Sequence, residues 1–484
     1  MVTAATTPAR DAEKTLIAGR WTDSPDPREV RNPADGSVVA TIGYGGAREA
    51  RAAGDAAADA FGSWSRTTGR ERAEVLARCA EFLHADAEPI GRLLCLETGK
   101  LPAEAVAEIR FAAEYFRYFA ERARDPQGEV LTPEAPDRRQ RTFRRPAGVV
   151  ACLTPWNFPV SIQARKVAPA LAAGCTVVSR PSEKAPLAVA KMFRCLDAAG
   201  FPPGVVNLVH GAAAEITEAL LAHPAVRVVS FTGSTEVGRR VMRLASERIV
   251  RPALELGGDA PFVVFDDADL DQAVAGAMVA KFRNNGQSCI AANRFFVHDR
   301  VRAEFVDRLT AAIDELTVGD PLGTPAPTLG PLIDEARVNA VNGIVDEALS
   351  AGARRTTRHD FPLPRSGTYA PPALLVDVPD HVALARSEVF GPVAGVFGFE
   401  SDEDLLARAN ATEVGLAAYV YTRDLGRAER IPECLEAGIV GVNTPLPSVA
   451  YAPLGGVKQS GLGREGGPHG LEEFQQTRYV AVNI

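Results

Sequence analysis

The segment F-T-G-S-T-E-V-G at 231–238 closes an apolar run, 226–231, and leads into a helical pattern. A short apolar strand, a glycine-containing turn and a helix in this order indicate one unit of an α/β fold. Gly233 lets the backbone approach a phosphate, and free N–H groups at the start of the helix favour an anion. The middle glycine of G-x-G-x-x-G is missing. By itself such a segment is more often a simple helix N-cap after a tight turn.

Similar units lie on both sides of this segment. Strand–helix alternation predicts a parallel sheet with crossover helices, hence an open α/β domain. A second alternating region follows residue 289, so we expect two α/β domains. The apolar runs of the first region are 148–153, 176–179, 205–209, 226–231 and 262–265; the second region has runs at 295–298, 393–399, 419–422 and 439–442 and a helix near 301–316.

The ends of the chain follow other patterns. The first 125 residues predict Ala-rich helices after a short turn-rich lead, with Ile109, Ala112 and Phe116 on one apolar stripe. Residues 126–141 are polar and contain proline, which predicts an excursion formed by a pair of strands. Residues 479–484 predict an apolar strand with no obvious partner nearby, which could pair with another subunit.

Composition excludes several classes of protein. A chain of 484 residues suggests two or three domains, and 46% hydrophobic with 24% charged residues is ordinary for a soluble globular protein. The net charge of −8 argues against a nucleic-acid-binding protein. The seven cysteines are dispersed, without a C-x-x-C pair, which favours reduced thiols in the cytoplasm over disulfides or a zinc site. They are Cys79, Cys95, Cys152, Cys175, Cys195, Cys289 and Cys434.

The sequence predicts no export and no membrane anchor. Residues 1–10 are small and polar and lack the apolar centre of a signal peptide. No window approaches the roughly 20 apolar residues that span a bilayer. We therefore expect a cytoplasmic protein that binds neither membrane nor nucleic acid.

The stretch F-R-N-N-G-Q-S-C at 282–289 places one cysteine, Cys289, on a polar turn after an Ala/Val-rich helical segment. A thiol held there can act as a nucleophile, and Arg283, six positions upstream, could hold the anionic tail of a substrate. Taken alone, such a cysteine is more often a semi-buried small hydrophobic residue.

Three further residues could serve chemistry. Asn157, in the proline-framed loop T-P-W-N-F-P at 154–159, can donate an amide N–H to an oxyanion, although it also fits a turn. Glu255, in L-E-L-G-G, could be a half-buried general base or a helix cap. Glu388 stands beside the rigid turn F-G-P, where it could equally be an exposed loop acid.

Read together, these segments resemble the aldehyde dehydrogenase family from residue 21 to 479. The motifs occur in the family's order: P-W-N-F-P at 155–159, F-T-G-S-T-E-V-G at 231–238, L-E-L-G-G at 254–258, G-Q-S-C at 286–289, E-V-F-G-P at 388–392 and G-G-V-K-Q-S-G at 455–461. The resemblance implies an α/β fold with a Rossmann-type NAD-binding domain (1–125 and 146–257), an α/β catalytic domain (258–457) and a small β oligomerisation arm (126–145 and 458–484). It also implies a homodimer or homotetramer.

The resemblance assigns Cys289 as the nucleophile that attacks the aldehyde carbon. Asn157 and the Cys289 backbone N–H would form the oxyanion hole, and the thiohemiacetal would pass hydride to the nicotinamide. Glu255 would activate the water that hydrolyses the thioester. Cofactor contacts are assigned to Thr154, Pro155, Trp156, Arg180, Ser182, Glu183, Gly233, Ser234, Leu256, Glu388 and Phe390, and no metal is implied.

Glu183 stands where the adenine ribose hydroxyls would bind. A carboxylate there accepts their hydrogen bonds and repels a 2′-phosphate, which favours NAD over NADP. Arg180 replaces the lysine usual in the family, and a guanidinium suits a phosphate, so NADP stays open as a cofactor.

Among its relatives the chain most resembles succinate-semialdehyde dehydrogenases, which hold the far carboxylate with two arginines and a serine. The matching positions are Arg165, Arg283 and Ser448, with Phe158 beside them as a further substrate contact. Leu454 departs from the usual phenylalanine, and the loop 444–448 carries two prolines instead of Glu-Gly. A second cysteine found in some relatives is Ala291 here, which rules out a disulfide switch between those positions.

The sequence therefore predicts NAD(P)-dependent oxidation of a short acidic aldehyde, similar to succinate semialdehyde, to the carboxylic acid. A phosphonate- or sulfonate-bearing semialdehyde would satisfy the same arginines, and a broader aliphatic aldehyde dehydrogenase is a further alternative. A CoA-acylating enzyme is disfavoured because such enzymes typically lack a glutamate at the position of Glu255. A catalytically silent protein is disfavoured because Cys289, Asn157 and Glu255 are all present.

Overall fold

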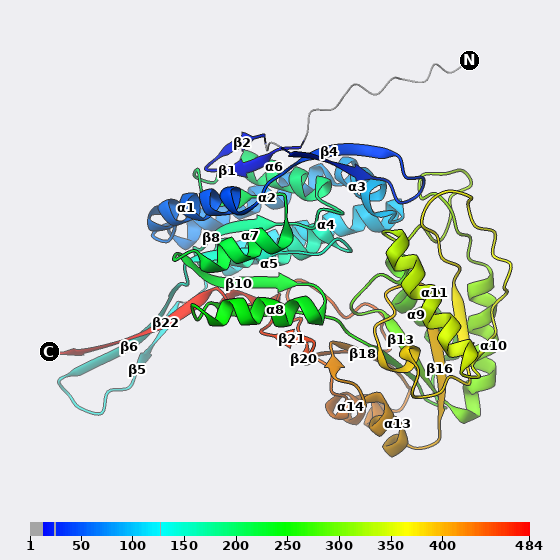
Figure 1. Cartoon of the computed structure of the whole chain (residues 1–484). Coiled ribbons are helices and arrows are strands. Elements are labelled where there is room, and N and C mark those ends of the chain that lie inside the picture. Colours follow the sequence, from blue (N-terminus) through cyan, green and yellow to red (C-terminus); the bar gives the residue numbers. More distant parts are fainter. Residues whose placement is uncertain (1–12, 24–25, 126) are drawn as a thin grey trace, which may run out of the picture.

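A parallel sheet forms the centre of the first α/β body in the computed structural model, which describes residues 13–23, 26–125 and 127–484 (Figure 1). The interpretation of residues 1–10 lies outside the described residues. The strand order is β2-β1-β9-β8-β7-β10-β11-β21, parallel from β9 to β11 and antiparallel at both edges. The strands are β1 (Thr15–Ile17), β2 (Arg20–Thr22), β7 (Val149–Leu153), β8 (Thr176–Arg180), β9 (Val206–Leu208), β10 (Val226–Thr232), β11 (Arg251–Glu255) and β21 (Gly461–Leu462).

Helices cover both faces of this sheet because its strands are apolar on both sides. In β7, Val150 and Cys152 pack into one core cluster, and Val149 and Ala151 pack into another. This double burial is typical of parallel sheets. One face carries α2 (Gly69–Ala85), α3 (Ala87–Thr98), α4 (Pro102–Arg122), α5 (Pro159–Ala173) and α6 (Leu187–Ala199); the other carries α1 (Ala47–Trp64), α7 (Ala213–Ala222) and α8 (Thr235–Ser246).

A second sheet, β14-β15-β16-β13-β12-β18-β19, forms the other α/β body and is parallel from β15 to β19. The two predicted α/β regions are thus confirmed, but the run 262–265 belongs to this second sheet and not to the first. Its strands are β12 (Ala260–Val264), β13 (Ala292–His298), β14 (Arg354–Arg355), β15 (Ala373–Val376), β16 (Val393–Phe399), β18 (Ala417–Tyr421) and β19 (Ile439–Val442); its helices are α9 (Leu270–Phe282), the 3₁₀ turn η1 (Arg283–Gly286), α10 (Asp299–Asp314), α11 (Glu335–Ser350), α12 (Ala383–Arg386), α13 (Asp402–Ala409) and α14 (Leu425–Cys434).

The lead before the first helix holds more structure than the sequence suggested. β1 and β2 form a hairpin on the edge of the first sheet, and β3 (Asp26–Arg31) pairs with β4 (Val38–Tyr44). β1 and β2 are only three residues long, and β2 and β3 expose most of their side chains, as edge strands do, so no apolar pattern marks them. Within the described ranges, none of the helices combines the length and apolar character that crossing a bilayer requires.

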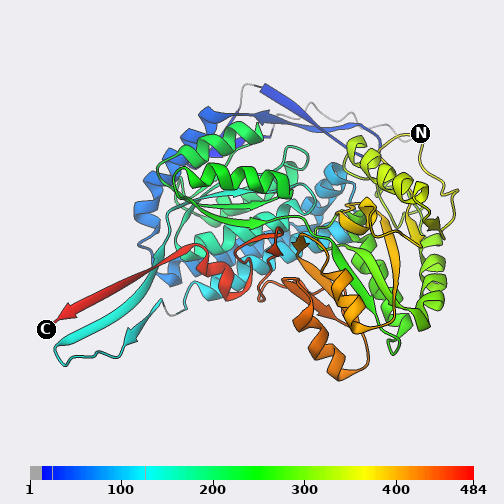
Figure 2. The same cartoon turned by 60° about the horizontal axis from the view of Figure 1, so that its bottom comes forward.

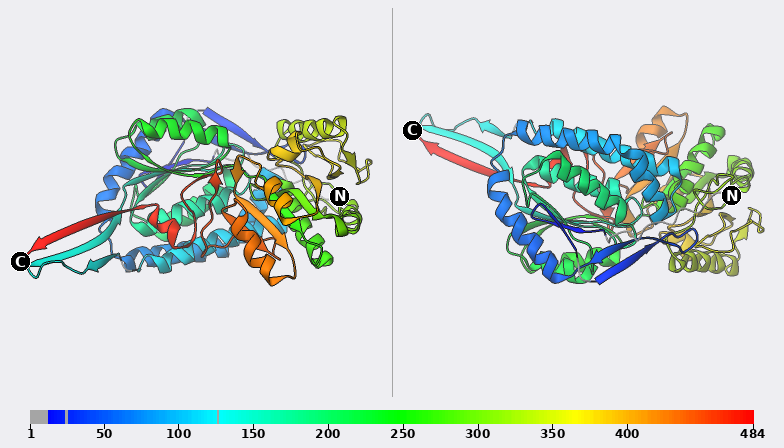
Figure 3. Two further views of the ribbon diagram at one scale, coloured as in Figure 1. Left: turned by 90° about the horizontal axis from the view of Figure 1, so that it is seen from below. Right: turned by 90° about the horizontal axis from the view of Figure 1, so that it is seen from above.

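The arm that leaves the main body is built from β5 (Gly128–Leu131), β6 (Arg138–Pro146) and β22 (Gln475–Asn483) (Figures 2 and 3). The predicted pair of strands is confirmed. The terminal strand does have a partner in its own chain, since β22 pairs with β6 in antiparallel register over its full length. β22 nevertheless forms the edge of this sheet, with Tyr479 and Val482 exposed. Its pairing with another subunit stays a prediction.

Short segments near the C-terminus connect the two bodies. β17 (Val414–Gly415) of the second body pairs with β20 (Val457–Lys458), and β21 then joins the first sheet beside β11. α15 (Gly467–Glu472) follows and packs on α5. β21 therefore lies within the first sheet, although the division expected from the sequence assigns 458–484 to the arm. The division into domains itself stays a prediction.

Gly461 is the point where this connection is sterically tightest. It has a φ of +138°, and a Cβ there would lie 1.9 Å from the carbonyl oxygen of Leu254. We expect Gly461→Ala to separate β21 from β11 and lower the free energy of unfolding by about 2 kcal/mol or more, measured by the shift of the urea midpoint. Gly62→Ala, in α1 with open space around the new methyl group, is the control and should not destabilise the protein. Equal midpoints for the two variants would contradict this expectation.

Candidate active site

The carboxyl ends of four neighbouring parallel strands of the first sheet form one side of the site. Leu153 lies opposite both Arg180 and Phe231, and Thr232 lies opposite Glu255, so β7, β8, β10 and β11 end at the same edge. Ligands of open α/β sheets bind at this edge. The segments that carry most of the sequence-predicted cofactor residues begin here.

The turn that carries Cys289 forms the opposite side, at the amino end of β13. Asn284, Asn285 and Gly286 have φ values of 54°, 58° and 74°, a left-handed run that asparagine and glycine tolerate best. The Asn284 side-chain amide donates to the carbonyl oxygens of Asn157 and Gln287, both at 3.0 Å. Side-chain hydrogen bonds thus hold the strained turn against the loop of Asn157.

Two buried residues on the first body, which the sequence did not single out, hold that loop from behind. The Lys100 ammonium donates to the Asn157 carbonyl oxygen at 3.0 Å and pairs with Glu108. Glu108 accepts from the backbone N–H groups of Val160 and Ser161, at 3.0 and 3.2 Å, at the start of α5. The Asn157 side-chain amide donates to the Gln287 carbonyl oxygen at 3.2 Å, which leaves its second N–H for a ligand.

A cavity of about 210 Å³ lies between the two sides. It brings together Cys289, Asn157 and most of the predicted cofactor residues. The N-terminus of α8, capped by Ser234, opens onto it and presents backbone N–H groups that suit a phosphate. Its lining is Pro155, Trp156, Asn157, Thr232, Gly233, Ser234, Leu256, Gly257, Cys289, Arg337, Glu388 and Phe390.

Two aromatic rings and a closely packed glycine shape this lining. The Trp156 and Phe390 rings meet edge to face with centroids 5.4 Å apart, and a Cβ on Gly257 would lie 2.9 Å from a Glu388 carboxylate oxygen. Arg337, which the sequence analysis missed, also lines the cavity, and its buried Nε has no partner among the described residues. No short motif marks it, since it sits in the first turn of α11.

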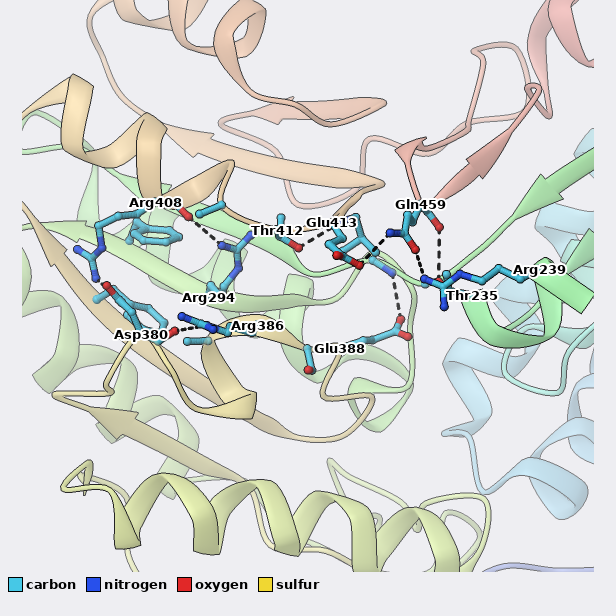
Figure 4. Close-up of a pocket in the computed structure, with 18 residues that line it drawn as sticks. Thr235, Arg239, Arg294, Asp380, Arg386, Glu388, Arg408, Thr412, Glu413 and Gln459 are labelled. Atoms are coloured by element: carbon cyan, nitrogen blue, oxygen red, sulfur yellow. Dashed lines mark hydrogen bonds and ion pairs between the residues drawn. The ribbon is translucent and has the colours of Figure 1, made fainter.

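A wider cleft of about 840 Å³ adjoins this cavity at Gly257 and Glu388 (Figure 4). Gln459, in the connection between β20 and β21, bonds to Arg239 of α8 and donates to Glu413 at 2.8 Å. This link joins the walls contributed by the two bodies. The cavity is therefore open to one side through a polar cleft.

Predicted cofactor residues at the end of β8 lie apart from the cavity lining. Arg180 pairs with Glu183 and donates to the Gly211 carbonyl oxygen at 2.9 Å. Glu183 is exposed and Ser182 is buried. The Thr154 hydroxyl is directed away, since it donates to the Gln163 side chain at 2.7 Å.

Burial raises the pKa of the Cys289 thiol and of two nearby carboxyl groups. It raises the pKa of the Cys289 thiol to about 12, with a contribution from the Glu388 charge and against the effect of Arg165. Burial also raises the pKa of Glu388 to about 7. The pKa of Glu255 is well above its usual value because of burial and the nearby Glu465 carboxylate. A buried carboxyl of this kind is a stronger base than an exposed one.

Of the predicted tail-binding residues, only Arg165 is shown to act on the thiol. Arg165, only 7% exposed, acts electrostatically on both Cys289 and Glu255, and its Nε pairs with Glu465 at 2.6 Å. Arg283 lies over the Phe158 ring, with Cζ 5.2 Å from the ring centroid. The sequence analysis assigned both arginines to the substrate tail and did not predict these contacts within the chain.

Ser448, the third predicted tail contact, is half-buried and interacts with the Tyr115 hydroxyl beside Arg165. Leu454 is buried, with its backbone in two 2.7 Å hydrogen bonds to Glu465. The loop 444–448 therefore reaches the same cluster as Arg165.

The aldehyde dehydrogenase family model matches residues 21–480. The chain belongs to the aldehyde dehydrogenase family. The NADP(+)-linked succinate-semialdehyde dehydrogenase GabD of Escherichia coli is 43% identical over 477 residues, covering 98% of each chain. The 3-sulfolactaldehyde dehydrogenase of Pseudomonas putida is 43% identical over 97% of each chain. The solved structure of succinate-semialdehyde dehydrogenase from Burkholderia pseudomallei is 42% identical, with a TM-score of 0.95 over the whole of both chains.

The raised pKa of Cys289 in this aldehyde dehydrogenase has a measurable consequence. Because the thiolate is the reactive form, we expect the rate of inactivation by iodoacetamide to rise about tenfold per pH unit between pH 7 and 9. Mass spectrometry should show that loss of activity follows alkylation of Cys289. The exposed Cys434 is the comparison site, and a Cys434→Ser variant should inactivate at the wild-type rate. Inactivation that follows Cys434, or that does not change with pH, would refute the expectation.

Proposed function

We propose that this aldehyde dehydrogenase oxidises a short aldehyde with an anionic tail, such as succinate semialdehyde, to the carboxylic acid. The position of Arg165 carries the proposal. Its guanidinium is almost completely buried, yet lies near enough to Cys289 and Glu255 to act on both. A buried cation beside a nucleophile provides a charge-assisted contact for the far end of a short substrate. Arg283 and Ser448 add contacts from the other elements.

The covalent chemistry is assigned to Cys289. Its thiol loses a proton and the sulfur bonds to the carbonyl carbon, while the Asn157 amide and the Cys289 backbone N–H stabilise the oxyanion, as donors aimed at developing charge do. A nicotinamide cofactor supplies the hydride acceptor when bound. Glu255 then takes a proton from the water that attacks the thioester, and the thiol is released with the carboxylic acid.

That cofactor would be held by five residues of the cavity lining: Gly233, Ser234, Trp156, Glu388 and Phe390. NAD is favoured, since Glu183 places a negative charge at the end of β8 where the adenine ribose would lie. Arg180 is already paired with Glu183 and with the Gly211 carbonyl oxygen. NADP use would require Arg180 to leave this pair.

A sulfonate-bearing aldehyde is the second candidate substrate. The proposed tail contacts, Arg165, Arg283 and Ser448, offer two guanidinium groups and one hydroxyl group as donors, which serve a sulfonate as well as a carboxylate. One relative at 43% identity is named a 3-sulfolactaldehyde dehydrogenase. A phosphonate tail falls in the same class. Leu454 replaces the phenylalanine usual in the family, so oxidation of a broader range of aliphatic aldehydes is the third candidate function.

We further propose a cytoplasmic homodimer or homotetramer. The arm supports this, because β22 presents an edge with Tyr479, Val482 and Ile484 exposed at 53%, 41% and 70%. Such an edge is normally covered. The net charge of −8 fits a small-molecule enzyme rather than a nucleic-acid-binding protein.

A panel of aldehydes with NAD tests the substrate class, and Arg283→Ala tests its structural basis. Wild-type enzyme should turn over succinate semialdehyde faster than butyraldehyde. Arg283→Ala should raise KM for the acid by about 10-fold or more, because a charge-assisted hydrogen bond contributes about 1.5–3 kcal/mol, and should leave KM for butyraldehyde unchanged. Arg354→Ala, an exposed arginine of β14, is the control. Faster turnover of neutral aldehydes would reject the acidic substrate, and equal effects on both substrates would reject the role of Arg283.

Glu183→Gln tests the proposed cofactor preference. Removing the carboxylate frees Arg180 for a 2′-phosphate and removes the repulsion, so the ratio of kcat/KM for NADP to that for NAD should rise at least tenfold. Initial rates with each cofactor at saturating aldehyde measure it. Glu215→Gln, an exposed glutamate of α7, is the matched control. An unchanged ratio in Glu183→Gln would show that Glu183 does not discriminate between the cofactors.

A further inference from the structure

Glu104 lies in the first turn of α4, and neither the sequence patterns nor the proposed chemistry uses it. Both oxygens of its carboxylate accept from the backbone N–H of Asn284, each at 3.1 Å. Asn284 is only 2% exposed and has the left-handed φ of 54°. The backbone N–H of a buried residue requires an acceptor, and hydrogen bonds to an ionised acceptor are the strong ones. Glu104 therefore anchors the turn before Cys289 through its main chain.

The segment 99–104, which ends at Glu104, contacts both sides of the site. The Gly99 carbonyl oxygen accepts from the Asn285 side chain at 3.2 Å, on the side of the thiol. The Lys100 ammonium donates to the Asn157 carbonyl oxygen at 3.0 Å, on the side of the amide donor. One short piece of chain therefore sets where the turn that carries the thiol lies relative to the loop of the amide.

The hydrogen bonds of Asn284 extend this anchor to the amide itself. Its side chain donates to the carbonyl oxygens of Asn157 and Gln287, both at 3.0 Å. The Gln287 carbonyl oxygen also accepts from the Asn157 side-chain amide at 3.2 Å. The direction of the Asn284 side chain follows from its backbone conformation, which Glu104 holds. A continuous series of hydrogen bonds thus runs from the Glu104 carboxylate to the amide that the proposed chemistry uses.

We propose that Glu104 is a positioning residue that aligns the Asn157 amide with the Cys289 thiol by holding the Asn284 backbone. The inference rests on the proposed function and extends it by one residue. A left-handed conformation at a residue with a Cβ persists only where the surrounding structure enforces it. Without the carboxylate, the turn relaxes and the Asn284 side chain leaves the Asn157 loop. The amide then no longer faces the oxygen on which negative charge develops, and the sulfur–carbon bond forms more slowly.

Glu104→Ala and Glu104→Gln form the direct test, because alanine removes the acceptor and glutamine keeps one oxygen that can accept. In Glu104→Ala the single-turnover rate of NADH formation should fall about tenfold or more for both succinate semialdehyde and butyraldehyde, since both form the same oxyanion. Glu104→Gln should stay within about threefold of wild type. Stopped-flow absorbance at saturating cofactor and aldehyde measures these rates.

Glu114→Gln, an exposed glutamate of the same helix, is the control for these rates and should match wild type. A wild-type rate in Glu104→Ala would overturn the inference. A Glu104→Gln enzyme as slow as Glu104→Ala would overturn it too, because the retained acceptor would then have no effect.

Alkylation of Cys289 by iodoacetamide separates misalignment from local unfolding. This reaction requires the thiolate but no oxyanion donor. Burial raises the pKa of the Cys289 thiol to about 12, so an unfolded turn would expose the thiol, lower its pKa and speed alkylation. We expect the alkylation rate of Glu104→Ala to stay within about threefold of wild type. An increase of about tenfold or more would show a merely structural role and overturn the inference.

A double-mutant cycle shows whether Glu104 acts through Asn157. If it does, Asn157→Ala should slow NADH formation, and Glu104→Ala combined with Asn157→Ala should slow it little further. Multiplicative effects of the two substitutions would overturn the inference.

The outcomes also distinguish this inference from the function on which it rests. Undiminished rates in Cys289→Ala or Asn157→Ala would refute the proposed chemistry and, with it, the inference. If both of these variants are slow and Glu104→Ala reacts at the wild-type rate, the proposed chemistry stands and only the inference fails. The preference for acidic aldehydes does not affect this test, because an acidic and a neutral aldehyde are expected to respond alike.

Discussion

The hydrogen bonds of the Asn284 side chain are the contact on which the site depends. They join the left-handed turn before Cys289 to the carbonyl oxygen of Asn157, and so connect the amino edge of one parallel sheet to the carboxyl edge of the other. Lys100 binds the same carbonyl oxygen from behind. A thiol on one body and an amide donor on the other can face one reacting atom only if this junction is rigid. Buried, fully used hydrogen bonds provide that rigidity.

The electrostatics of the site come from a second buried cluster. Glu465 pairs with Arg165 and with Lys166, and all three side chains are nearly inaccessible to solvent. Burial alone would raise the pKa of Glu465, but Lys166 and Arg165 lower it below its usual value. One carboxylate facing two cations leaves one positive charge uncompensated. The anionic substrate tail that we propose would supply the missing negative charge, whereas a neutral aldehyde would leave the buried charge unbalanced.

Sequence reasoning predicted the features that repeat locally. Apolar runs at strand spacing revealed both parallel sheets, and ordered motifs placed Cys289, Asn157 and Glu388 around one cavity. It assigned the run 262–265 to the wrong sheet, because a buried strand has the same pattern in either body. It missed β3 and β4, of which β3 carries mostly exposed polar residues.

The residues that sequence reasoning missed act through tertiary contacts. Lys100, Glu108 and Glu465 belong to ordinary helical or turn patterns, and nothing in their spacing shows that they meet at Asn157 or Arg165. A buried ion pair is recognised only when both partners have been placed in space.

If the enzyme acts as we propose, the same cluster would link tail binding to the chemistry of Glu255. The nearby Glu465 charge and burial together raise the pKa of Glu255, while Arg165 and Lys166 lower it. A bound anionic tail would offset part of the Arg165 charge, which would weaken one of the favourable fields on an ionised Glu255 and keep its proton affinity high. Glu255 would thereby be a stronger base while substrate is bound than when the tail site is empty. In the proposed function, recognition of the far end of the substrate and activation of water at its near end would thus share one guanidinium group.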